Sequence, residues 1–138
     1  MGERLPKPQD IERPAERTLE SGLSRSEPFE VGGRLVTDVG GSIDTPVLST
    51  PGMIAMMERT AALLALEHLP EGKATVGFEV CIKHVGGVGE GAAAQALATL
   101  TEIADDRKLR FDVEVTSDGR TIGVGTHERR IIDVGGGA

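Results

Sequence analysis

The chain has 138 residues, the length of one domain, and it is long enough for a hydrophobic core without disulfides or structural metals. Its net charge is −7, and it has three Phe but no Trp or Tyr, so nucleic acid is not an expected partner. Cys81 is the only cysteine, which excludes an internal disulfide and a cysteine-rich metal site. We expect this thiol to be buried. We also expect a cytoplasmic protein without a membrane span, because charges interrupt its longest apolar stretch.

The N-terminal part of the chain is predicted to be an arm. Residues 1–26 are rich in Pro, Glu, Arg and Ser and show no sustained period, which is typical of a poorly ordered segment. A strand-like distribution of apolar residues follows at residues 28–41. We place one folded domain at residues 27–134 and a flexible glycine-rich tail at residues 135–138.

Residues 51–69 are predicted to form a helix that is apolar on nearly every side, and such a helix is normally buried. The sequence Thr50-Pro51 is typical of an N-cap followed by proline at the first helical position. Glu58 is the exception in this helix, because a buried carboxylate is unfavourable unless it is paired or hydrogen-bonded. It either faces the surface and pairs with a neighbour such as Arg59, or it lies at the floor of a cleft and orients a water molecule or a catalytic partner.

Four strands are predicted after the helix, at residues 74–85, 92–104, 109–117 and 121–134. In the first of them one face is predicted to carry Val76, Phe78, Val80 and Ile82. The segment "GGVGEG" is a turn rather than a phosphate-binding loop, because no Lys-Ser or Lys-Thr pair and no helix follow it. The sequence also has no Gly-x-Ser-x-Gly elbow and no cluster with metal-ligand spacing, so neither an α/β-hydrolase nor a metal site is expected.

One long buried helix and about five antiparallel strands predict an α+β fold. A curled sheet wrapped around the central helix covers it on most sides, which is the hotdog architecture. Such a sheet leaves an edge strand with unpaired backbone groups, and pairing with a second copy of the chain removes that exposed edge. We therefore expect a homodimer.

Three segments, "VLSTPGMIAMMERTA", "TVGFEVCIKHV" and "IGVGTHERRIID", together resemble one family. In this order and spacing they resemble the hotdog-fold thioesterases of the fluoroacetyl-CoA thioesterase-like family, over residues 28–134. That family has a catalytic Thr at the start of the central helix, a Glu eight residues later and a His at the end of the following strand. The resemblance implies that the catalytic residues are Thr50, Glu58 and His84. It implies substrate-binding roles for Gly77 and Arg129.

Each of these residues also has a simpler explanation. An N-cap role would fully explain Thr50, and a histidine at a strand end, such as His84, is often a polar surface residue. A histidine can, however, move protons at physiological pH. Eight residues of one helix separate Thr50 from Glu58 by about 12 Å. Either Thr50 lies in a loop that folds back, or the site is assembled from two subunits.

The resemblance implies hydrolysis of a short-chain acyl-CoA thioester to the free acid and CoA, with no cofactor, because CoA is part of the substrate. The alternatives are a hotdog enoyl-CoA hydratase or dehydratase and a non-catalytic acyl-CoA-binding module. In the fluoroacetyl-CoA enzyme, aromatic residues ahead of the catalytic Thr cover the acyl group. Gly41 and Asp44 stand at about those positions here, so we expect no marked preference for fluoroacetyl-CoA.

Overall fold

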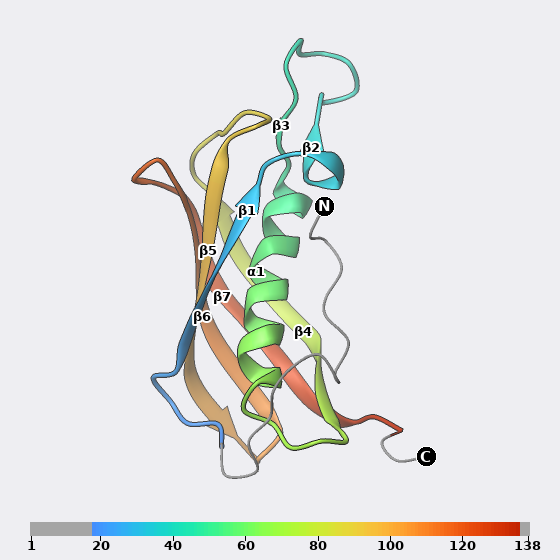
Figure 1. Ribbon diagram of the computed structural model, residues 1–138, viewed down its shortest axis with the longest axis vertical. Helices are drawn as coiled ribbons and strands as arrows, with labels where there is room; N and C mark the ends of the chain where they lie inside the picture. The colour runs from blue at the N-terminus through green and yellow to red at the C-terminus, as the bar shows by residue number, and fades with distance from the viewer. Residues whose placement is uncertain (1–17, 136–138) are drawn as a thin grey trace.

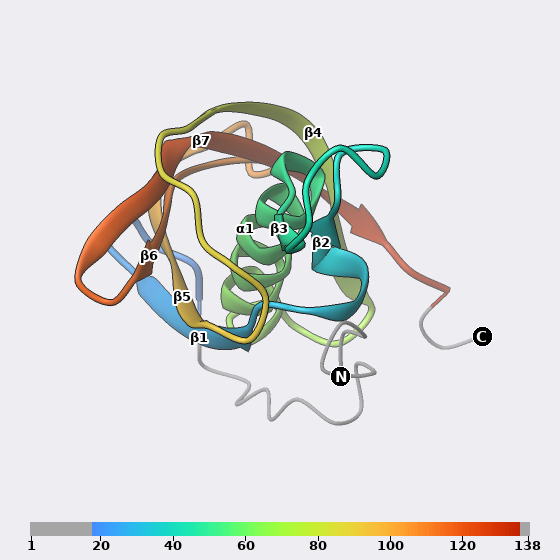
Figure 2. The same ribbon diagram turned by 90° about the horizontal axis from the view of Figure 1, so that it is seen from above.

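The computed structural model describes residues 18–135, in which a long sheet curls around the helix α1 (Figures 1 and 2). The elements follow in the order β1 (Ser24–Glu30), the 3-10 helix η2 (Gly33–Leu35), β2 (Val36–Thr37), β3 (Val47–Leu48), α1 (Thr50–Leu66), β4 (Lys73–His84), β5 (Ala93–Ala104), β6 (Lys108–Ser117) and β7 (Arg120–Asp133). The five long strands form an antiparallel sheet in the order β1-β5-β6-β7-β4, and β2 pairs with β3. The predicted α+β hotdog fold is confirmed.

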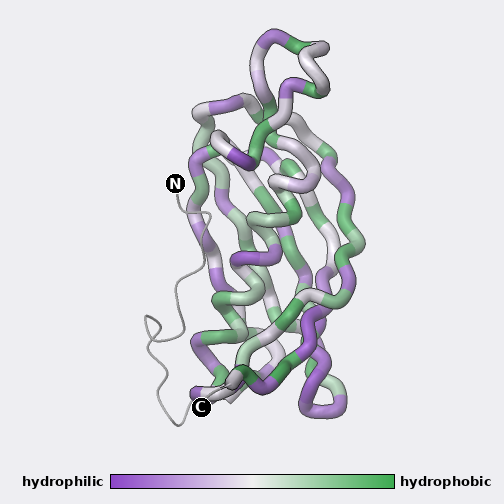
Figure 3. Tube along the Cα trace, turned by 90° about the vertical axis from the view of Figure 1, so that its right-hand side faces the viewer, coloured by the Kyte–Doolittle hydropathy of each residue, from purple (hydrophilic) through white to green (hydrophobic). Residues whose placement is uncertain are grey.

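The helix α1 lies in the concave face of the sheet, and it is apolar along most of its length, with a hydrophilic segment near its middle (Figure 3). Its buried apolar side chains are Met53, Met56, Met57, Ala61, Leu63, Leu64 and Ala65. The facing side of β5 consists mainly of alanine, and Ala96 and Ala98 are completely buried. These small side chains allow the helix to approach the sheet closely, because a larger side chain there would need space that the packed core does not have.

The start of α1 differs by one residue from the prediction. Ser49 is the N-cap, since its hydroxyl accepts a hydrogen bond of 2.9 Å from the backbone N–H of Gly52. Thr50 is the first helical residue, and Pro51 follows within the first turn. The Thr50 hydroxyl is therefore not used for capping and is available for another partner.

A β-bulge in β4 overturns the predicted alternation of this strand. Gly77 and Glu79 oppose consecutive residues of β7, so Phe78 is an extra residue without a partner there. An extra residue reverses which face the preceding side chains occupy. Gly77 consequently faces α1, on the same side as Ile82, which packs against the core. Val76 and Phe78, predicted to share that side, are instead 45% and 59% exposed.

Cys81 is exposed, which contradicts the expectation that it is buried. It belongs to the outward-facing set of residues in β4, and β4 is an edge strand that no other strand of the chain covers. Alternation in a strand defines two faces but does not say which face is covered, and here the cysteine lies on the uncovered one.

The strands β1 and β7 mark the two ends of the described sheet. β1 begins at Ser24, within the segment 1–26 that was expected to be an arm, and residues 1–17 lie outside the described part. β7 ends at Asp133, and residues 136–138 of the expected tail also lie outside it. No helix in residues 18–135 has the length and hydropathy needed to span a membrane.

Candidate active site

Thr50 and His84 form a hydrogen-bonded pair at one end of the molecule. The hydroxyl oxygen of Thr50, in the first turn of α1, lies 2.9 Å from Nδ1 of His84, the last residue of β4. The other ring nitrogen, Nε2, is buried and has no hydrogen-bond partner within residues 18–135. A hydroxyl beside an imidazole is the arrangement in which the ring can take up the hydroxyl proton and activate the oxygen as a nucleophile.

The position of Thr50 is fixed by close packing against η2. The backbone N–H and the hydroxyl of Ser49 both donate to the carbonyl of Leu35, at 2.8 and 3.1 Å. A side chain at Gly52 would collide with the backbone of Leu35, so glycine is needed for this close approach. The first turn of α1 therefore has a defined location relative to η2.

The segments that flank the pair are joined to one another. Leu48 donates a backbone hydrogen bond of 2.9 Å to Val88, and Glu90 donates one of 3.0 Å to Pro46. Residues 46–48 lead directly into α1, and residues 85–90 follow directly after β4. These bonds hold the start of the helix beside the end of the strand, which brings the threonine and histidine side chains together.

Glu58, Gly77 and Arg129 form a second group, at the middle of α1. The carboxylate oxygen Oε2 of Glu58 lies 3.9 Å from Nη1 of Arg129, and a Cβ added at Gly77 would come within 2.7 Å of the same oxygen. The side chain of Glu58 is 42% exposed, whereas that of Arg129 is 8% exposed. Within the described residues the ion pair of Glu58 is thus with β7 and not with Arg59, and its carboxylate lies over the backbone of β4.

Arg129 donates three hydrogen bonds to neutral groups. Its Nε donates to the hydroxyl of Thr75 at 2.7 Å, its Nη2 to the Thr75 carbonyl at 3.0 Å, and its Nη1 to Nε2 of His127 at 3.1 Å. Nδ1 of His127 then donates to the Glu79 carbonyl at 2.8 Å, an assignment that follows from these partners. Burial lowers the pKa of His127, which favours this neutral ring, and the nearby Arg129 lowers it further.

The positive charge of Arg129 is compensated by the carboxylate of Glu58. Burial lowers the pKa of Arg129, and the negative charge of Glu58 raises it. Hydrogen bonds to Thr75 and His127 fix the position of the guanidinium, so the positive charge beside Glu58 has a defined location.

Thr75 and His127 were not assigned to the site from the sequence. Their spacing was the available signal, since each lies two residues before Gly77 or Arg129 and therefore on the same face of its strand.

The two groups lie apart within one subunit. Thr50 and Glu58 are separated by eight residues of α1, or about 12 Å. His84 and Gly77 are separated by seven residues of β4, or roughly 20 Å. The structure therefore joins Thr50 to His84, and Glu58 to Gly77 and Arg129, but it does not bring the two groups together in one chain.

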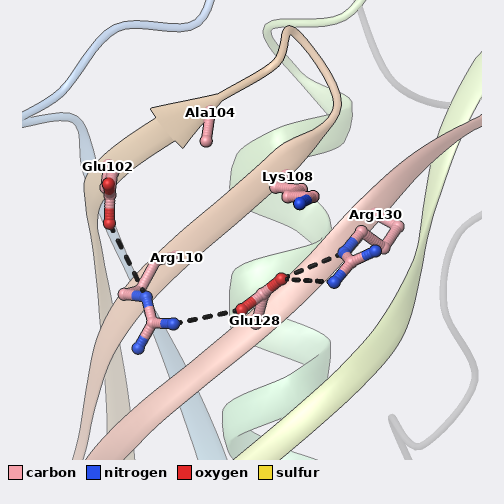
Figure 4. Close-up of a pocket in the computed structure, with 6 residues that line it drawn as sticks. All are labelled: Glu102, Ala104, Lys108, Arg110, Glu128 and Arg130. Carbon is pink, nitrogen blue, oxygen red and sulfur yellow. Dashed lines mark hydrogen bonds and ion pairs between the residues drawn. The ribbon is translucent and has the colours of Figure 1, made fainter.

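The pockets among the described residues include one beside the start of α1 and one on the outer face of the sheet. One, of about 290 Å³, runs along the first turns of α1. It is lined by Phe29, Arg34, Leu35, Pro51, Gly52, Ala55, Met56 and Arg59. The other, of about 270 Å³, lies on the face of the sheet turned away from α1 (Figure 4). Its charged side chains come from β5, β6 and β7 and are largely paired with one another.

The charged side chains of the outer pocket contact the bulge in β4 through Arg130. Glu128 pairs with Arg110 at 3.2 Å and with Arg130 at 2.8 Å (Figure 4). The guanidinium of Arg130 also lies 3.6 Å from the centre of the Phe78 ring, in a cation–π contact. This contact holds Phe78 on the outer face of β4, and the bulge in turn directs Gly77 toward Glu58.

Comparison with known proteins identifies the family. Residues 33–135, which include both groups of site residues, match the model of the fluoroacetyl-CoA-specific thioesterases. The chain belongs to this family. It is 28% identical over 86 residues to the fluoroacetyl-CoA thioesterase of Streptantibioticus cattleyicolor. That match covers 62% of this chain and 61% of the relative, less than two thirds of its length.

Solved structures with the same fold include a variant of the fluoroacetyl-CoA-specific thioesterase in complex with fluoroacetate and CoA. It has a TM-score of 0.76 and 22% identity, and the match covers 84% of this chain and 97% of that one. A thioesterase superfamily member from Thermus thermophilus has a TM-score of 0.75 and 23% identity, with coverages of 85% and 86%. At these identities the structures show the fold.

Proposed function

We propose that this protein hydrolyses short-chain acyl-CoA thioesters to the free acid and CoA. The observation that carries the proposal is the 2.9 Å contact between the Thr50 hydroxyl and Nδ1 of His84, two residues that the resemblance to this family implies to be catalytic. The reaction needs no cofactor, because CoA is part of the substrate. The cytoplasm is the compartment that fits this activity.

In the proposed reaction His84 removes a proton from the Thr50 hydroxyl, or from a water molecule that this hydroxyl holds. The freed oxygen attacks the thioester carbonyl, and backbone N–H groups near Gly77 of the partner subunit stabilise the oxyanion. Collapse of the intermediate breaks the carbon–sulfur bond, and the CoA thiolate takes the proton from His84. Where Thr50 itself attacks, a water molecule activated by His84 then hydrolyses the threonine ester.

The carboxylate of Glu58 completes this site from a second subunit. Within one chain Glu58 lies about 12 Å along α1 from Thr50, which is too far for it to contact the Thr50–His84 pair. Glu58 of the partner subunit is proposed to orient His84 or the attacking water. Arg129 of that same partner subunit is proposed to hold the carboxylate in place.

The edge strand β4 is the proposed dimer interface. Of the two edges of the sheet, β1 carries Pro28, whose missing backbone N–H disfavours the addition of a further strand. β4 has no proline and exposes Val76 and Phe78. Two antiparallel β4 strands related by a two-fold axis place the end of one, at His84, beside the Gly77 region of the other.

Subunit mixing tests the shared site directly. Glu58→Gln and His84→Ala should each lose about 10²–10⁴-fold in turnover as homodimers. In a randomly mixed dimer population half the dimers are heterodimers, and each of these has one complete site. The mixture should therefore regain about a quarter of wild-type activity. Heterodimers isolated with two affinity tags that remain inactive would refute the shared site.

The activity itself is tested by measuring the steady-state rate at which CoA is released from acetyl-, butyryl- and phenylacetyl-CoA. Free CoA is measured by chromatography, because exposed Cys81 would react with thiol reagents. Multiple turnovers that release CoA support the proposal. Hydration of crotonyl-CoA without release of CoA would instead identify a hydratase, and tight binding without turnover would identify an acyl-CoA-binding module.

A further inference from the structure

The outer face of β4 carries two opposite charges at a symmetric spacing. Glu79 and Lys83 are both exposed, and neither side chain forms an ion pair within residues 18–135. Cys81 lies midway between them on the same face. If two antiparallel β4 strands pair about a two-fold axis at Cys81, each Glu79 lies opposite Lys83 of the partner subunit. The dimer then contains two symmetry-related Glu79–Lys83 pairs.

The choice of registers is limited. The inner face of each sheet covers a helix, so a continuous sheet with both helices on one side allows a residue to oppose only a residue of the same face. The pairing can then shift only in steps of two residues. An axis at Val80 places Lys83 opposite Val76 of the partner subunit and leaves Glu79 opposite Cys81 of the partner subunit.

The other neighbouring registers are also less favourable. An axis at Ile82 places Glu79 opposite the partner's Val85, with no matched charge. An axis at Glu79 or at Lys83 brings two like charges directly opposite each other, which is destabilising in a sheet. Among these five registers, the axis at Cys81 is the one that pairs the charges.

The bulge makes this register consistent with the proposed active site. Beyond Glu79, Phe78 is an extra residue, so the next residue that faces α1 is Gly77. With the axis at Cys81, Gly77 lies opposite His84 of the partner subunit, and it is over Gly77 that the Glu58 carboxylate lies. Val76, which is 45% exposed, lies opposite the partner's Val85, which is 57% exposed, so each covers the other.

We infer that Glu79 and Lys83 are positioning residues, which pair across the two-fold axis and set the register that aligns His84 of one subunit with Glu58 of the other. The inference rests on the proposed homodimer and its shared site. It assigns a role in catalysis to two residues that touch neither substrate nor the reacting groups, through the alignment of two copies of the chain.

Charge exchange tests the pairing. A cross-strand pair of opposite charges shifts an equilibrium by up to about fivefold, and the symmetric dimer contains two such pairs. Glu79→Lys and Lys83→Glu should therefore each raise the dimer Kd by about tenfold or more and lower activity at low protein concentration. The double variant E79K/K83E restores both pairs, so its Kd and kcat/KM should return to within about threefold of wild type. These differences should shrink in 1 M salt.

Cys81 reports the register without any substrate. Directly opposed residues of antiparallel strands have Cα atoms about 4.5–5.5 Å apart, within the range that a disulfide spans. Copper phenanthroline, which oxidises paired thiols, should convert the wild-type dimer to a covalent dimer on a non-reducing gel. Cys81→Ser gives the background, and E79K should crosslink more slowly than E79K/K83E.

The outcomes separate this inference from the proposed activity. A dimer by sedimentation that does not crosslink at Cys81, or a double variant no better than the single variants, overturns the register. Efficient crosslinking with rescue by charge exchange supports it, even where no acyl-CoA is cleaved. In that case the proposed hydrolysis fails and the assignment of the interface stands.

Discussion

Replacing Gly77 with alanine would place a methyl group where the carboxylate of Glu58 now lies. The added Cβ would be 2.7 Å from Oε2 of Glu58 and 3.6 Å from Nη1 of Arg129. The carboxylate oxygen must then retreat by roughly 0.7 Å to restore ordinary van der Waals contact at 3.4 Å. The backbone of Gly77 requires no positive φ, so this displacement is the main consequence of the change.

The expected result is a loss of activity with little loss of stability. A displacement of about 1 Å in a catalytic group can lower a rate by about 100-fold, which corresponds to about 2.7 kcal/mol. The free energy of unfolding should change by less than about 1 kcal/mol, because the displaced atom is the end of a flexible side chain and Gly→Ala reduces the entropy of the unfolded chain. Chromatographic kcat/KM and urea denaturation measure the two quantities.

Gly32→Ala is the matched control, because its added Cβ meets no atom within 4 Å and its φ is 175°. The double variant G77A/E58Q should be no slower than Glu58→Gln alone, since the carboxylate that the methyl group displaces is already absent. Wild-type kcat/KM in a folded Gly77→Ala protein would refute the argument that this backbone position locates Glu58.

Three further predictions concern other parts of the molecule. Thr50→Ala should lower turnover by about 100-fold or more with an unchanged melting temperature, whereas Ser49→Ala should lose about 1 kcal/mol of stability, because Ser49 provides the cap; a Thr50→Ala enzyme of normal activity would contradict the mechanism. The pKa of His127 is lowered on folding from its usual 6.5, so below about pH 6.5 the unfolded chain takes up a proton that the folded chain does not. The free energy of unfolding should therefore fall with decreasing pH by up to about 1.4 kcal/mol per unit from this group, and denaturation of His127→Gln between pH 7.5 and 5 should show a shallower slope. The loop that contains Gly41 and Asp44 has no aromatic side chain, so kcat/KM for fluoroacetyl-CoA should lie near that for acetyl-CoA; a preference of about a thousandfold, or roughly 4 kcal/mol, would show that another segment covers the acyl group.

Much of the fold could be predicted because its periodic signals are long. The four strands after the helix and the apolar helix itself follow from patterns of ten or more residues, and the curled sheet follows from the need to cover that helix. The bulge could not be predicted in the same way. Val76 and Phe78 continue an apolar alternation without interruption, and only pairing with β7 shows that one residue is extra.

The candidate site was predictable only in part. The resemblance named Thr50, Glu58 and His84 but left their arrangement open, and the start of the helix was misplaced by one residue because Ser49 and Thr50 are both good caps. The hydrogen bonds of Arg129 to Thr75 and of His127 to the Glu79 carbonyl join residues that are distant in the sequence. Such contacts depend on the register between β4 and β7, which no single strand pattern contains.

The helix α1 carries Thr50 at its first residue and Glu58 two turns later, within one continuous rod. In the proposed dimer each helix would then serve both active centres, one through its hydroxyl and the other through its carboxylate. A ligand that pushes this rod along its axis at one centre would also move the carboxylate at the other. Catalysis at the two centres would accordingly be coupled, and binding of a ligand at one centre would change turnover at the other.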